Sequence, residues 1–68
     1  MDDVYKITVR RRGTNEVPYR ETFRTEDQQV AERRASNVWS YERFDTEPDR
    51  FRLYLHKKGN SKAILTIG

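Results

Sequence analysis

Three stretches of this chain alternate between apolar and polar residues, which is the period of a β-strand with one buried side and one solvent-facing side. Val4–Arg12 and Arg50–Lys57 follow the pattern closely, whereas Val17–Arg24 departs from it at Glu21, an acidic residue at an inward position. Glu21 indicates that this strand lies near an edge of the sheet or that an arginine pairs with the carboxylate. Pro18 cannot donate a ladder hydrogen bond, so it also favours an edge strand or the first position of a strand.

A stretch with helical period separates the second alternating stretch from the third. Thr25–Gln28 fits a capping box, in which the threonine accepts hydrogen bonds from first-turn amides and the glutamine reaches back. We expect the helix to continue to about Phe44, because Pro48 disfavours helical structure at the residue before it. The apolar stripe of this helix is formed by Val30, Ala31, Ala35, Val38, Trp39 and Tyr41.

The composition limits the core to a thin layer. Only 34% of the 68 residues are hydrophobic, and there is no cysteine for a disulfide or a thiolate metal site. A fourth strand, Lys62–Ile67, follows a turn at Gly59. We therefore predict one domain over residues 1–68 with an α+β fold, in which a ββαββ chain forms an antiparallel sheet with one helix packed on one face. The expected inner positions of the sheet are Tyr5, Ile7, Val9, Phe23, Leu53 and Leu55.

Charge is distributed unevenly along the chain. Residues 1–24 hold six basic and four acidic residues, residues 25–49 hold three and seven, and residues 50–68 hold five and none. The net charge of +3 is by itself a weak argument for any partner. The segregation is more informative, because it makes the strand segments cationic and the helix with its exit loop acidic.

If the helix covers the apolar side of every strand, the other side of the sheet carries many cations and no carboxylate. Arginine suits an anionic partner, because its planar donor fork matches phosphate and stacks on bases. Tyr54 is a candidate stacking platform for a base on this side, and Lys57 and Lys58 at the second hairpin tip are placed to touch a nucleic-acid backbone. The predicted nucleic-acid-binding residues are Lys6, Arg10, Arg12, Arg20, Arg24, Arg50, Arg52, Tyr54, His56, Lys57, Lys58 and Lys62.

A solvated sheet face is the plain alternative, since such faces commonly carry Arg, Lys and Thr, and charged edges prevent aggregation. Like charges on neighbouring strands destabilise a sheet, however, so a whole acid-free surface favours an anionic partner. The first hypothesis is a small nucleic-acid-binding module, for DNA or RNA. The second is a small protein-binding adaptor or inhibitor, of the kind that phages and mobile elements encode, which docks the same face on an acidic host protein.

The remaining motifs argue against an enzyme. The sequence has no nucleophile elbow, no phosphate loop and no distinctive Ser/His/Asp set. The single histidine, His56, has no cysteine and no clustered carboxylates with metal-ligand spacing near it. We therefore expect no catalytic residue, no metal site and no cofactor.

Two further expectations concern location and assembly. No apolar run approaches the length of a membrane span, so we expect no membrane partner and a cytoplasmic location, in the host cytoplasm if the protein is viral. Ile64 and Leu65 put an apolar residue on each side of the last strand. This strand is therefore predicted to join a homodimer or to lie against another element.

Overall fold

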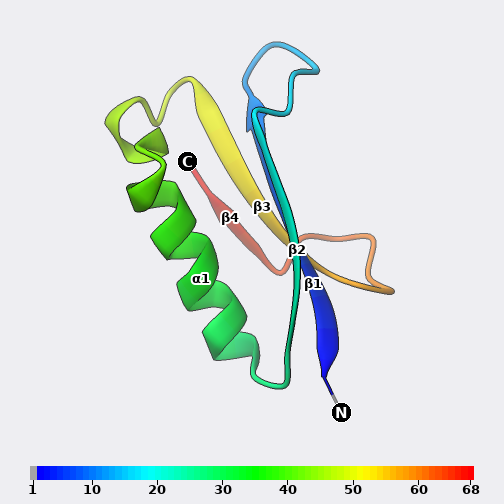
Figure 1. The fold of residues 1–68 in the computed structure, drawn as a ribbon. Helices are drawn as coiled ribbons and strands as arrows, with labels where there is room; N and C mark the ends of the chain where they lie inside the picture. The colour runs from blue at the N-terminus through cyan, green and yellow to red at the C-terminus, as the bar shows by residue number, and fades with distance from the viewer. Residues whose placement is uncertain (1) are drawn as a thin grey trace.

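The computed structural model describes residues 2–68, so Met1, the first residue of the expected domain, lies outside the described residues. The elements are β1 (Asp3–Arg11), β2 (Tyr19–Thr25), α1 (Gln28–Tyr41), β3 (Phe51–Lys57) and β4 (Leu65–Ile67). The strands form one antiparallel sheet in the order β2-β1-β3-β4, and α1 lies against one face of it (Figure 1). The predicted α+β class and ββαββ order are confirmed.

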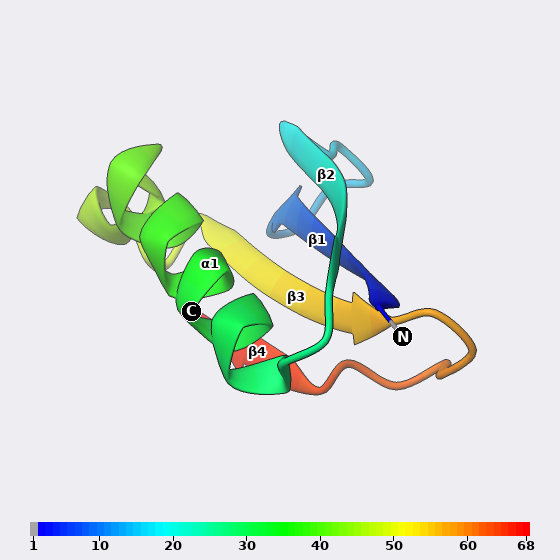
Figure 2. The same ribbon diagram turned by 60° about the horizontal axis from the view of Figure 1, so that its bottom comes forward.

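β2 forms one edge of the sheet and β4 forms the other. Figure 2 shows α1 lying beside β3 and β4, with β2 at the opposite edge of the sheet. Pro18 immediately precedes β2, so its missing N–H interrupts no ladder. Glu21 lies on this edge strand and forms an ion pair with Arg34 of α1. The expectations drawn from Pro18 and Glu21 are therefore confirmed.

The core lies between α1 and the inner side of the two central strands. Its strand residues are fully or almost fully buried, and its helix residues include two alanines that let the backbone of α1 approach the sheet. These core residues are Tyr5, Ile7, Val9, Leu53 and Leu55 from the strands, and Ala31, Ala35, Val38 and Trp39 from the helix. Phe23 of β2 is half-buried and stacks on Tyr5, with ring centroids 5.9 Å apart. The predicted inner positions of the sheet are confirmed.

The helix begins later than the capping-box pattern predicts. Asp27, not Thr25, is its N-cap, and the Asp27 Oδ1 accepts a hydrogen bond from the Gln29 N–H at 2.8 Å. Thr25 lies opposite Asp3 as the last residue of β2, so its backbone belongs to the ladder. The Thr25 hydroxyl instead accepts from the Asp27 N–H at 3.3 Å, which supports the turn into the helix.

The helix also ends earlier than predicted, at Tyr41 instead of Phe44. Arg43 adopts a left-handed conformation with φ 64°, and a 3-10 turn over Phe44–Thr46 follows. This reversal folds the Phe44 ring back onto the core, where its centroid lies 6.0 Å from that of Trp39 and 5.0 Å from that of Phe51. Aromatic packing thus replaces the predicted last helical turn.

Two residues of the predicted apolar stripe lie outside the core. Val30 is 47% exposed and Tyr41 is 87% exposed. Helical geometry explains both, since a turn of about 100° per residue places them on the same flank of α1, roughly 80–100° from Ala31. That flank faces β2 and not the centre of the sheet.

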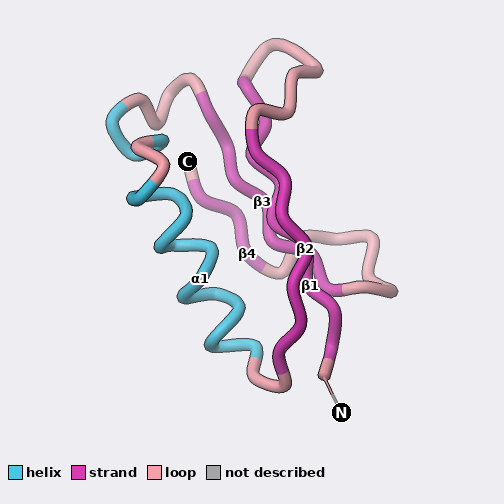
Figure 3. Tube along the Cα trace, in the orientation of Figure 1, coloured by secondary structure: helices cyan, strands magenta, loops and turns pink. Residues whose placement is uncertain are grey.

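The last strand is shorter than predicted, because residues 58–64 form a loop and not part of the strand (Figure 3). The Ile64 N–H donates to the Leu55 carbonyl at 2.8 Å, and Ile64 and Leu65 both pack half-buried against the core. The predicted contact with another element is therefore confirmed. It accounts for both apolar side chains within one chain, and a homodimer stays a prediction.

Gly68 lies against the aromatic residues of the core. Its φ is 102°, and a Cβ atom added to it would lie 2.7 Å from the Phe51 carbonyl oxygen and 2.8 Å from the Trp39 ring. The Gly68 carbonyl accepts a hydrogen bond from Arg52 Nε at 3.2 Å. A glycine is therefore required here by both conformation and space.

Candidate nucleic-acid interface

The register of the sheet gathers the predicted basic residues on its open side. Residues directly opposite each other in a ladder share a face. Lys6 lies opposite His56, Thr8 lies opposite Tyr54, and Arg10 lies opposite Arg52. On the other flank of β1, the register adds the outward residues of β2. We call this surface the cationic face: Lys6, Thr8, Arg10, Arg20, Thr22, Arg24, Arg52, Tyr54 and His56.

The charges of the cationic face are not neutralised by acidic side chains. Lys6, Arg10, Arg20 and Arg24 are exposed. Within residues 2–68, none of the four forms an ion pair with a carboxylate. Their guanidinium and ammonium groups therefore stay available to an external anion.

Arg10 and Arg52 form the most unfavourable pair on this face. They lie directly opposite each other on the two central strands, where side chains have Cβ atoms about 4.5–5.5 Å apart. Arg52 is half-buried, and its hydrogen bond to the Gly68 carbonyl holds the base of its guanidinium in place. Arg10 is exposed and free to turn. Like charges directly opposite each other destabilise an antiparallel pair.

Two shallow hollows meet on the cationic face. One of about 390 Å³ is lined by Arg10, Arg12, Arg52, Tyr54 and the turn at residues 13–15. The other, of about 500 Å³, is lined by Lys6, Thr8, Arg10, Tyr54 and His56. Arg10 and Tyr54 border both hollows. The Tyr54 and His56 rings lie side by side with centroids 6.3 Å apart and planes tilted by 33°, so two aromatic rings lie beside the cations.

Three of the predicted residues, Lys57, Lys58 and Lys62, lie away from this surface. Lys57 belongs to the helix side of the sheet, because it is opposite the buried Tyr5, and its Nζ lies 3.2 Å from Asp3 Oδ2. Lys58 and Lys62 are exposed in the loop that leads to β4. Arg50 precedes β3 and lies opposite Arg12 at the end of the sheet, where its Nη1 lies 3.9 Å from Glu47 Oε1.

Arg12 occupies an intermediate position just beyond β1. Its N–H donates to the Arg50 carbonyl at 2.8 Å, which extends the pairing of β1 with β3 by one step. Its Nε donates to the Phe51 carbonyl at 3.4 Å, so the side chain lies over the end of the sheet. Arg12 therefore borders the cationic face and lines the first hollow.

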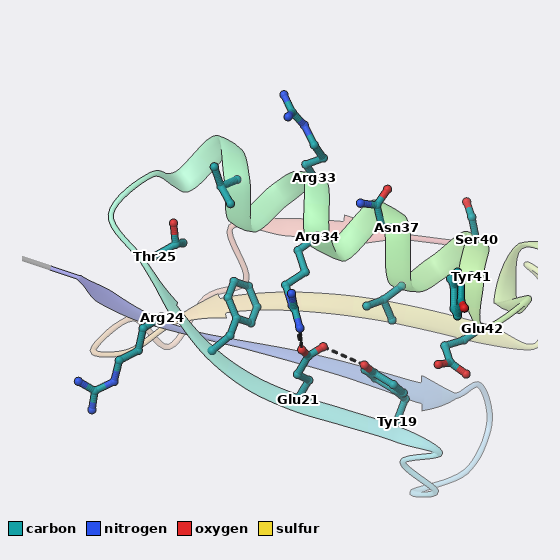
Figure 4. Close-up of a pocket in the computed structure, with 13 residues that line it drawn as sticks. Tyr19, Glu21, Arg24, Thr25, Arg33, Arg34, Asn37, Ser40, Tyr41 and Glu42 are labelled. Carbon is teal, nitrogen blue, oxygen red and sulfur yellow. Dashed lines mark hydrogen bonds and ion pairs between the residues drawn. The ribbon is translucent and has the colours of Figure 1, made fainter.

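A groove that the sequence did not predict lies between β2 and α1. It measures about 830 Å³, and we call it the β2–α1 groove. Figure 4 shows Arg34 reaching from the helix to Glu21, which in turn accepts a hydrogen bond from the Tyr19 hydroxyl at 2.8 Å. The Arg34 guanidinium also lies over the Phe23 ring, 5.0 Å from its centroid. Two features of the sequence could have indicated this groove: the acidic Glu21 at an inward strand position, and the helix flank that carries Val30 and Tyr41.

The ionisable groups of the groove influence one another. The hydrogen bond from Arg34 lowers the pKa of Glu21 below its ordinary value, against the opposing effect of burial. The same contact raises the pKa of Arg34. The pKa of Tyr19 is raised, mainly because its hydroxyl donates to the Glu21 carboxylate. Glu21 is therefore ionised at neutral pH and links the strand to the helix.

Comparison with known proteins gives no family for this chain: no family model, no curated protein and no solved structure matches it. Among residues 2–68, no helix is both long enough and apolar enough to cross a membrane. The same residues contain no group of three His, Asp or Glu side chains that could hold a metal ion. The chemistry of the cationic face and of the β2–α1 groove is therefore the evidence for what the protein binds.

Proposed function

We propose that this protein binds nucleic acid through the cationic face of its sheet. The observation that carries the proposal is the Arg10–Arg52 pair. These two arginines oppose each other on the central strands, and the described residues of the cationic face include no carboxylate. An arrangement that destabilises the free protein is relieved when an anion lies between the two guanidinium groups. Phosphate suits this position, because arginine donates to it through two parallel N–H groups.

The positions of the residues give them different roles in binding. The exposed cations would contact phosphates, which provides affinity without sequence preference. Tyr54 lies beside Arg10 and Arg52 at the border of the two hollows, where its ring can stack on an unpaired base. Lys57, paired with Asp3 on the helix side, has no role in this proposal.

The test is a titration of fluorescent duplex and single-stranded DNA and of single-stranded RNA over a range of salt concentrations. Log affinity is expected to fall linearly with log salt, with a slope of about −0.9 per phosphate contact on duplex DNA and about −0.7 on single strands. The variant Arg10→Ala is expected to weaken binding and to make the slope shallower by about one contact. Arg33→Ala on the helix removes the same charge and is the matched control, with little expected effect.

Tyr54→Ala distinguishes two modes of nucleic-acid binding. A loss of about 1–3 kcal/mol on single strands, with little loss on a duplex, indicates stacking on a base. An equal and small loss on both indicates that the face contacts backbones alone. Absence of binding to all three probes at low salt would refute the proposal, and docking on an acidic protein would then become the better explanation of the cationic face.

A further inference from the structure

β2 is an edge strand, and the hydrogen bonds of its neighbours fix the direction of its main-chain groups. The Lys58 N–H donates to the Val4 carbonyl at 2.8 Å, and the Arg12 N–H donates to the Arg50 carbonyl at 2.8 Å. In an antiparallel ladder, both main-chain groups of one residue point to the same neighbouring strand, and those of the next residue point the other way. The main-chain N–H and C=O groups of the even-numbered residues of β1 therefore point to β3, and those of the odd-numbered residues point to β2.

The register carries this alternation into β2. Tyr5 of β1 lies opposite Phe23, so the odd-numbered residues of β2 direct their N–H and C=O groups to β1. Arg20, Thr22 and Arg24 then direct theirs outward. Within the described residues, no strand pairs with this edge. The seven residues of β2 thus offer an unpaired edge about 23 Å long.

The side chains beside this edge differ between its two faces. Tyr19 and Phe23 point to the helix side and line the β2–α1 groove together with the exposed Val30 and Tyr41 of α1 (Figure 4). Most of the exposed surface on that side is apolar, and Glu21, between Tyr19 and Phe23 in β2, is paired with Arg34. On the other side, Arg20 and Arg24 carry positive charges, with the small Thr22 between them. A strand added to the edge would have alternate side chains over the groove and over the cationic face.

We propose that β2 and the β2–α1 groove form a docking site for an extended peptide segment of a partner protein, in which apolar and acidic residues alternate. The main chain of the segment would pair with Arg20, Thr22 and Arg24. Its apolar side chains would enter the groove over Val30 and Tyr41, and its carboxylates would meet the arginines of β2 on the other face. This mode of recognition takes affinity from main-chain hydrogen bonds and specificity from the alternating side chains.

Charge also argues against a second copy of the chain as the occupant. Two β2 strands paired antiparallel about Thr22 would place Arg20 of one copy opposite Arg24 of the other, twice. Both residues are exposed, and within residues 2–68 neither has an acidic partner. Like charges directly opposite each other destabilise an antiparallel pair. An acidic strand has the opposite effect at the same two positions.

The test uses a fluorescent eight-residue peptide of four Glu-Val repeats, with four Lys-Val repeats as the charge-reversed control. Fluorescence anisotropy is expected to show binding of the Glu-Val peptide and at least tenfold weaker binding of the Lys-Val peptide. Amide hydrogen exchange is expected to slow at least tenfold at Arg20, Thr22 and Arg24 in the complex. Protection elsewhere without protection of these three amides would overturn the proposal.

Thr22→Pro tests the main-chain contact directly. It removes an outward N–H that β1 does not use, so we expect the fold to be retained and peptide affinity to fall at least tenfold. Thr66→Pro is the matched control at the opposite edge of the sheet. Thr66 lies opposite Tyr54, whose main-chain groups point to β1, so the Thr66 N–H also points outward. Equal losses in the two variants would overturn the proposal. Val30→Ser is a second test in case Thr22→Pro unfolds, with an expected loss of three- to tenfold.

This docking site does not depend on the nucleic-acid proposal. The variant Arg10→Ala is expected to leave peptide affinity within twofold, because Arg10 lies on β1, away from the edge. If Glu-Val peptide binding fails while nucleic acid still binds, the docking proposal is overturned alone. Sedimentation of the free protein at increasing concentration adds a further check, and a dimer that Thr22→Pro abolishes would show that a second copy is the occupant.

Discussion

Removing Arg10 is expected to stabilise the protein while it weakens nucleic-acid binding. The repulsion can be sized from the ladder, where Arg10 and Arg52 are directly opposed. If the two guanidinium groups move to about 7 Å apart, their unit charges repel by roughly 0.6 kcal/mol in water. For a domain of this size, that energy corresponds to a rise in Tm of about 2–5 °C for Arg10→Thr at low salt. Arg52 is the poorer choice, because its replacement also removes the hydrogen bond to Gly68.

The assay is thermal unfolding followed by circular dichroism at 10 mM and at 1 M salt. Arg24→Thr is the matched control: it lies on the same face, introduces the same residue and faces Val4 instead of a cation. Salt should abolish the gain of Arg10→Thr, because the screening length falls to about 3 Å at 1 M. An equal gain in both variants, or a gain that persists in 1 M salt, would refute the repulsion argument.

Three further predictions concern the core, the groove and the end of β4. Leu53 is fully buried, so Leu53→Ala should lower the free energy of unfolding by about 2–5 kcal/mol in urea titrations with an unchanged m-value. Because the pKa of Glu21 is lowered in the folded state, its contribution is present above the ordinary value of 4.5 and is lost as pH falls through the folded pKa. Glu21→Gln should therefore cost up to about 1 kcal/mol at pH 7, since Arg34 is half-exposed, and the variant should lose less stability than the wild type on acidification. Gly68→Ala should lower the free energy of unfolding by about 1–2 kcal/mol because of the positive φ, and an unchanged Tm would contradict the requirement for glycine at this position.

The two sides of the sheet could be predicted because the signal is local. Each strand repeats its pattern every two residues, so the side of Ile7, Leu53 and their neighbours follows from a few adjacent letters. Glu21 departs from this pattern. The structure places it on the edge strand β2, where its carboxylate pairs with Arg34. A residue that departed from the local pattern thus marked one of the two proposed binding surfaces.

The rest depended on contacts between distant parts of the chain. Thr25 and Asp27 both resemble N-caps, and only the pairing of Thr25 with Asp3 decides between them. Lys57 follows the inner period of β3, but its position beside the hairpin turn made it look like part of the tip. The β2–α1 groove depends on the strand order and on the angular position of Val30 on the helix. Neither can be read from one segment alone.

The strand order has a consequence for the path by which the chain folds. β1 and β2 are neighbours in the sequence and can form a hairpin early, whereas β1 meets β3 only when residues about 50 positions apart come together, as Tyr5 and Lys57 do. Until then, the apolar side of the hairpin is exposed and open to pairing with another chain. Its arginines repel other hairpins during this interval. The charges that destabilise the finished sheet therefore protect the nascent one, and variants stripped of them should gain stability but lose soluble yield.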